Sequence, residues 1–238
     1  MNWNRTKLRV FMFALLALAG CEEIQTSTWI VKLSADPTLH EVELYREVEA
    51  ERPARAFAYS IEFPQSYYFY EDNHRHLKQT TIGLLFDRAT LGPFAPVVIK
   101  EAAKPEYAKR YVRPERILSE KYRLRSLLVI ITGLHGEQHI RRPALPKEAM
   151  PELPGFLWHA RATPGNPGSG GAMLHGYSTS DPPIHASCPA IDGDCTVEIQ
   201  YLRSKVRYRW PKADIEQAIP VARRLTAILA RHTKRRGG

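Results

Sequence analysis

Two histidines four residues apart form the pattern in this sequence that is closest to a metal site. In His135-Gly-Glu-Gln-His139, a helix would present both imidazoles to one zinc ion, as in zinc peptidases. Glu137 is displaced from the HExxH order of those enzymes, however, and Gly136 disfavours a helix. The segment also follows an apolar strand directly. We therefore interpret these histidines as surface residues of a turn and keep a metal-dependent hydrolase as the alternative.

The remaining histidines give weaker patterns. His74 and His76 could ligate a metal from one face of a strand, but no third ligand is identifiable. His159, His175 and His185 fall in the glycine-rich half of the sequence and could cluster in space. No serine lies in a GxSxG motif. The sequence thus predicts no catalytic residue, no metal site and no cofactor.

The first 21 residues are organised like an export signal. Arg5, Lys7 and Arg9 give a basic start, and the apolar stretch 10–19 has the length of a signal-peptide core but is too short to span a bilayer stably. Leu18-Ala-Gly-Cys21 follows. This segment resembles the lipobox of bacterial lipoproteins, in which an aliphatic residue and two small residues precede a cysteine whose thiol accepts the lipid. The alternative is an ordinary secretory peptide with a chance cysteine.

The resemblance implies that residues 1–20 are a signal peptide, that Cys21 is lipidated and that residues 21–28 form a tether. In that family the cysteine receives a diacylglycerol and an N-acyl chain, which together suffice for stable attachment to a bilayer. Glu22 follows the cysteine, where an aspartate would suggest inner-membrane retention. The implied location is therefore the outer membrane, facing the periplasm.

The charge of the exported part restricts its partners. The whole chain has a formal charge of +9, and the three basic residues of the leader leave +6 for residues 21–238. A moderately basic surface suits an acidic protein, an anionic lipid or the cell-wall polymer. Export argues against nucleic acid. We expect residues 29–234 to form a single α+β domain in the periplasm.

Two cysteines remain after lipidation. Cys188 and Cys195 form a close, even pair, and in an oxidising compartment this indicates a disulfide. Asp192-Gly193 between them favours a tight turn. Free thiols are the alternative, and a metal site would need further ligands.

Hydrophobic periodicity predicts mostly strands and one long helix. Residues 39–51 are ambiguous between helix and strand, with strand favoured. The charged, proline-containing segment 101–123 is expected to be loop with at most one helical turn. The other predicted strands are residues 28–33, 57–63, 80–86, 97–100, 127–132, 155–162 and 173–177, with a hairpin of 196–201 and 206–210.

An amphipathic helix is predicted near residues 213–232, with a kink or a late start at Pro220. Ile215, Ile219, Ala222, Leu225 and Leu229 share its apolar face. The predicted fold class is α+β, a largely antiparallel β-sheet with this C-terminal helix packed against it.

Two stretches are candidate binding surfaces. Outward-facing Tyr68 and Tyr70 beside Asp72 and Asn73 would give large contact area at low entropic cost, although packing in the core is the simpler interpretation.

The second stretch is a row of cations. Lys205, Arg207 and Arg209 occupy one face of a predicted strand, and Val206, Tyr208 and Trp210 occupy the other. This row is either a solvated outer face or a patch for an acidic partner.

The layout resembles lipoproteins that serve as immunity proteins against type VI secretion effectors. The likeness rests on the lipobox, on Ile61-Glu-Phe-Pro64 leading into aromatics and Asp72-Asn73, on the late cysteine pair, and on the hairpin before the closing helix. It implies a non-enzymatic protein that binds a secreted toxin in the periplasm. The alternatives are a periplasmic metal-dependent or cell-wall hydrolase, and a structural lipoprotein that binds peptidoglycan.

Overall fold

The structure is a computed structural model, and it describes residues 31–48, 54–71, 78–110, 114–134, 149–163 and 173–234. The predictions for the signal peptide, Cys21 and the tether lie outside these residues. So do those for Asp72, Asn73, His74, His76, and the segment His135 to His139.

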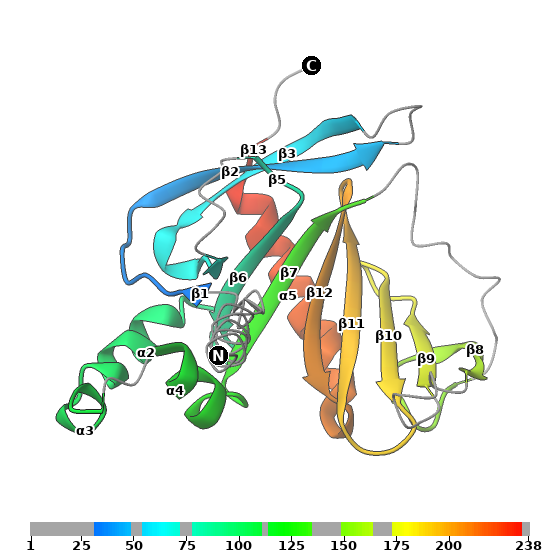
Figure 1. Cartoon of the computed structure of the whole chain (residues 1–238). Helices are drawn as coiled ribbons and strands as arrows, with labels where there is room; N and C mark the ends of the chain where they lie inside the picture. Colours follow the sequence, from blue (N-terminus) through cyan, green and yellow to red (C-terminus); the bar gives the residue numbers. More distant parts are fainter. Residues whose placement is uncertain are drawn as a thin grey trace, which may run out of the picture. The chain divides into compact units, whose positions relative to one another are not determined.

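A seven-stranded antiparallel sheet dominates the described fold (Figure 1). Its order is β6 (Thr81–Asp87), β7 (Ser126–Gly133), β12 (Ser204–Pro211), β11 (Asp194–Tyr201), β10 (Ile184–Pro189), β9 (Met173–Ser178) and β8 (Leu157–Thr163). Buried and less buried residues alternate along β7, β10, β11 and β12, so one face of the sheet packs into the main core. At β6 and β7 the other face packs against a smaller core that includes Leu85 and Leu128.

A second, mixed sheet has the order β13 (Thr233–Lys234), β3 (Ala54–Pro64), β2 (Leu39–Val48) and β5 (Lys78–Gln79), in which only β2 and β5 pair in parallel. A short pair joins β1 (Val31–Lys32) to β4 (Tyr70–Glu71), and a 3-10 turn, η1 (Gln65–Tyr67), follows β3. The ambiguous segment 39–51 is thus a strand over its first ten residues.

Helix α5 (Ala218–His232) covers the apolar face of the seven-stranded sheet (Figure 1). A 3-10 segment, η2 (Lys212–Gln217), precedes it, so the helix starts late, as Pro220 predicts. Two hydrogen bonds connect β12 to η2 and to the first residue of α5. Tyr208 Oη donates to the Ala218 carbonyl at 2.8 Å, and Trp210 Nε1 donates to the Asp214 carbonyl at 2.9 Å. The predicted α+β class, with a C-terminal helix on the sheet, is confirmed.

The prediction for residues 97–123 was wrong. This segment forms α2 (Ala95–Ala102), α3 (Pro105–Ala108) and α4 (Pro114–Lys121) rather than a short strand and a loop. The prolines that suggested breaks begin α3 and α4, where a missing N–H costs nothing because the first turn leaves its N–H groups unpaired. In α2, Ala95, Val98 and Glu101 recur every third residue on the buried face.

The disulfide between Cys188 and Cys195 is present, and it links the end of β10 to the start of β11. Both half-cystines are fully buried in the main core. Gly193 in the intervening turn has a φ of 154°, a backbone conformation that favours glycine. Among the described helices, none has both the length and the apolar composition to cross a membrane.

Candidate binding surface

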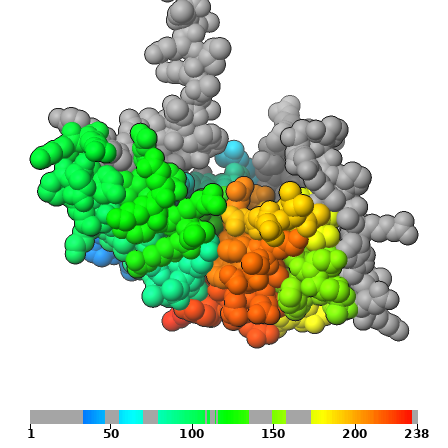
Figure 2. Space-filling model, turned by 90° about the horizontal axis from the view of Figure 1, so that it is seen from below, coloured from blue at the N-terminus to red at the C-terminus, as the bar shows by residue number. Residues whose placement is uncertain are grey.

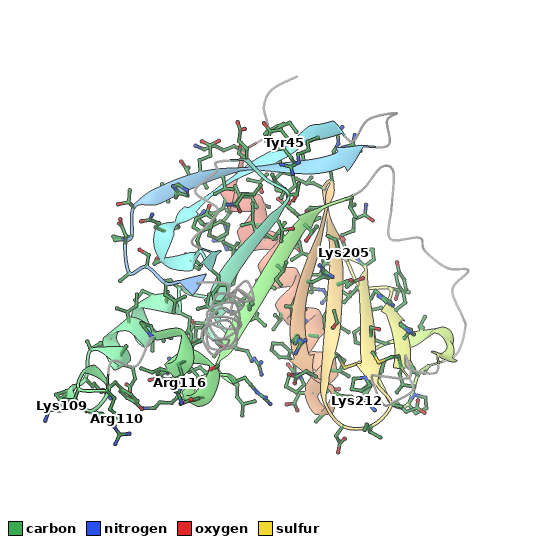
Figure 3. All side chains as sticks on the ribbon, viewed as in Figure 1. Tyr45, Lys109, Arg110, Arg116, Lys205 and Lys212 are labelled. Atoms are coloured by element: carbon green, nitrogen blue, oxygen red, sulfur yellow. A yellow bond between two sulfur atoms is a disulfide. The ribbon has the colours of Figure 1, made fainter. Side chains whose placement is uncertain are left out.

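On β10, β11 and β12, the face of the seven-stranded sheet that does not pack against α5 carries polar and charged side chains. On β12, Val206, Tyr208 and Trp210 are buried, whereas Arg207 and Arg209 are exposed. Lys205, labelled in Figure 3, lies on the same side of this strand and is partly exposed. The predicted division of β12 into a cationic and an apolar face is therefore confirmed.

Strand register brings polar residues of the neighbouring strands next to this row. Glu198 on β11 is the partner of both His185 on β10 and Arg207 on β12. Ser187 on β10 is the partner of His175 on β9. Since side chains alternate across a strand, these residues share the outer face.

We call Ser187, His175, His185, Glu198 and Lys205 the polar ladder. The imidazole rings of His175 and His185 stack in parallel with their centroids 5.6 Å apart. Ser187 Oγ lies 3.1 Å from His175 Nδ1, and Glu198 Oε2 lies 3.5 Å from both His185 Nδ1 and Lys205 Nζ. The ladder thus crosses four strands with each side chain held by a neighbour.

The ladder also fixes protonation states. The hydrogen bond from His185, with the nearby cations Lys205 and Arg207, lowers the pKa of Glu198 although burial opposes this shift. Burial lowers the pKa of His175, and the charge of His185 lowers it further. At neutral pH the surface therefore presents an ionised carboxylate and a neutral His175 beside the cations of β12.

The contact between Ser187 and His175 joins a nucleophile type to a base type. In a serine hydrolase a carboxylate would orient that same histidine. Here Glu198 instead contacts His185, and the two histidines meet face to face. Within the described residues, no three metal-binding side chains gather in one place.

Tyr68 corrects one prediction. Its side chain is only 1% exposed, so it belongs to the core and not to a binding surface. Its hydroxyl donates to the His40 carbonyl at 2.7 Å, and its ring meets Phe63 edge to face. Tyr70 lies in β4, but its side chain is not among those described, and Asp72 and Asn73 lie outside the described residues.

Sequence reasoning suggested that His175 and His185 could cluster, but it missed Ser187 and Glu198. Glu198 had a usable signal, because it alternates with the apolar residues of a predicted strand. Ser187 had none, because β10 was not predicted as a strand. The side chain of His159 is not among those described.

The depressed pKa of His175 predicts acid sensitivity. As the pH falls below 6.5, the ordinary value, the unfolded chain binds this proton before the folded chain does, so stability falls until the folded pKa is passed. Replacement of His175 by glutamine should make the loss shallower. Urea unfolding of the wild-type and His175→Gln chains at about pH 7.5 and about pH 5.5 would measure this loss of stability. An equal decrease in the free energy of unfolding of the two chains would contradict the prediction.

No protein-family model and no curated protein sequence matches the chain. Among solved structures, it is similar to the Neisseria meningitidis iron-regulated outer membrane lipoprotein FrpD, with a TM-score of 0.41 and 9% sequence identity over 80% of this chain and 92% of that one. A likeness at this TM-score carries no argument about function, which therefore rests on the residues of this chain.

Proposed function

We propose that this chain is a membrane-anchored envelope lipoprotein that acts as a non-enzymatic binding protein and recognises its partner with the outer face of strands β9 to β12. The observation that supports recognition is the polar ladder beside the exposed cations of β12, held on a sheet whose other face is fixed by α5. Anchoring is supported by the lipobox segment ending in Cys21.

The physical properties of this face suit an acidic protein partner. Arg207 and Arg209 can each bind a carboxylate with two hydrogen bonds, which gives directional as well as electrostatic complementarity. The backbone of a regular sheet is already ordered, so the ordering cost on binding is mainly the rotamer freedom of the exposed arginines. Opposite charge on the partner would also accelerate association.

The more specific proposal is that the partner is a secreted antibacterial toxin that reaches the periplasm. It is supported by the sequence resemblance to type VI immunity lipoproteins and by the lipid anchor, which would hold the protein where such toxins arrive. Neutralisation requires only tight binding over the toxin's site, and no chemistry by this chain.

A growth competition between sibling cells tests this role. Deletion of the gene should make cells susceptible to contact-dependent killing, and the wild-type gene should restore survival. A sheet-face variant, with Lys205, Arg207 and Arg209 each replaced by glutamate, should not restore it, because six units of charge change would repel an acidic partner.

A helix-face variant provides the charge-matched control. It replaces Arg223, Arg224 and Arg231 by glutamate, three exposed residues of α5 on the other side of the sheet, and it should protect like the wild type. Equal protection by the sheet-face variant would contradict the assigned surface. Survival of the deletion strain would contradict the toxin-neutralising role.

A further inference from the structure

We propose that α2, α3, α4 and the turn Tyr122–Arg125, which we call the helical lobe, dock onto an anionic phospholipid leaflet. The inference rests on the proposed lipid anchoring at Cys21 and adds a second membrane contact to it. Figure 2, viewed from below, shows these green residues gathered at one side of the surface, next to the start of β7.

Most of the net charge of the exported chain lies in this region. By sequence, residues 95–125 contain nine lysines and arginines and four glutamates, a formal charge of +5, whereas residues 21–238 total +6. The rest of the exported chain is thus nearly neutral. A local excess of this size attracts an anionic surface within about a Debye length, roughly 8 Å at physiological salt.

Ion pairs inside the lobe position some of these cations and leave others available. Buried Glu101 pairs with Lys104 at 2.8 Å and also with Lys121, while Arg125 pairs with Asp87 at 2.8 Å. These pairs fix the helices relative to one another and to β6. One carboxylate shared between two ammonium groups still leaves a net positive charge.

Three cations are available to an external anion. Lys109, Arg110 and Arg123 are exposed and form no ion pair with any residue that the structure describes. Figure 3 shows Lys109 and Arg110 at the far end of the lobe, pointing away from both sheets, with Arg116 on α4. Phosphate groups of a leaflet could therefore approach them without first breaking an ion pair with a residue that the structure describes.

Leu124 adds an exposed apolar side chain to the lobe, next to Arg123. It is 70% exposed and lies between Arg123 and Arg125 in the turn after α4. An aliphatic side chain flanked by cations is typical of segments that insert at the headgroup level of a membrane. Ile191, similarly exposed at 72%, lies instead next to Asp192 and close to Asp194, whose charges an anionic leaflet would repel.

A second membrane contact would strengthen the proposed anchor. Cys21 lies twelve positions before Leu33 in the sequence, and Leu33 packs against the small core of the lobe, formed by residues such as Leu85, Phe94 and Ile117. A lipid anchor gains stability from a polybasic second contact.

Cosedimentation of the lipid-free chain, residues 22–238, with vesicles tests the proposal. This fragment keeps every residue of both cores, which run from Leu33 to Leu229, so it retains what folds the domain. It should bind vesicles containing about one third phosphatidylglycerol, release in high salt, and not bind pure phosphatidylcholine. Absence of binding, or equal binding to both vesicles, would overturn the proposal.

A lobe variant identifies the surface. Replacement of Lys109, Arg110 and Arg123 by glutamate should weaken binding on the order of a hundredfold or more, given the usual contribution of each cation near an anionic leaflet. The helix-face variant changes the charge equally and should retain most of the binding. Equal weakening by both variants would show that net charge alone, not the lobe, determines binding, and would overturn the assignment.

Two aliphatic substitutions test insertion. Leu124→Ser should weaken vesicle binding severalfold, whereas Ile191→Ser should not, and the reverse order would overturn the assigned contact. Because the fragment lacks Cys21, its vesicle binding does not depend on lipidation. If the fragment fails to bind vesicles while the full chain is still labelled with lipid, only the docking proposal is contradicted. If the full chain is not labelled while the fragment still binds vesicles, only the anchoring proposal is contradicted.

Discussion

Replacement of Cys21 by serine is expected to abolish incorporation of labelled palmitate into the full chain. The lipobox requires a thiol as the nucleophile that accepts the diacylglycerol, and a serine hydroxyl is far less nucleophilic at neutral pH. The N-acyl chain is added only after that step in the lipoprotein family, so both lipid signals should be lost together. Fluorography of the immunoprecipitated protein after growth with labelled palmitate measures the effect.

The other two cysteines supply the control. A chain with Cys188 and Cys195 both replaced by serine should keep the label, because these residues are joined to one another in the core. Continued labelling of the Cys21→Ser chain would contradict the lipobox assignment.

The second large effect is expected at Gly133, at the end of β7. A Cβ atom there would lie 2.1 Å from the carbonyl oxygen of Tyr45 and 2.9 Å from Arg46 Cα, both backbone atoms of β2. Tyr45, labelled in Figure 3, lies in the four-stranded sheet, so Gly133 permits one sheet to approach the other closely. Gly133→Ala should reduce the free energy of unfolding by about 3 kcal/mol, the upper part of the range for overpacking.

Gly92→Ala is the matched control. Its Cβ would meet only the Thr90 side-chain oxygen, at 3.3 Å, so a shift of a few tenths of an ångström relieves the contact. Urea unfolding of residues 22–238 measures both variants, and the Gly92 variant should change by less than about 1 kcal/mol. Similar unfolding midpoints for the two variants would contradict a close backbone contact between β2 and β7.

The sequence-based predictions succeeded where the periodicity was regular. Alternation of apolar and polar residues from Thr196 to Trp210 correctly predicted the β11–β12 hairpin and the outward face of β12. The apolar stripe ending at Leu229 correctly predicted helix α5, and Pro220 correctly predicted that this helix starts late. In these elements each residue's environment is decided mainly by its own strand or helix, so local pattern suffices.

The failures have physical causes at particular residues. The β-branched run Val97-Val98-Ile99 has strand propensity, but Pro96 at the helix start and burial of one face made it a helix. Tyr68 was a candidate for a binding surface because Asp72 and Asn73 follow its aromatic cluster, yet it completes the core between β3 and β6, as the simpler interpretation predicted. The polar ladder depends on the register of four strands, and register between distant segments is not visible in a single sequence.

Affinity capture on residues 22–238, followed by mass spectrometry, tests whether the outer sheet face binds a secreted protein. Extracts should come from cells grown with their secretion machinery expressed. We expect one secreted protein in stoichiometric amounts on the wild-type and helix-face chains, and its loss on the sheet-face variant. Recovery of the same protein on all three chains would contradict the assigned recognition surface. Recovery of nothing specific on the wild-type chain would contradict the proposed binding function.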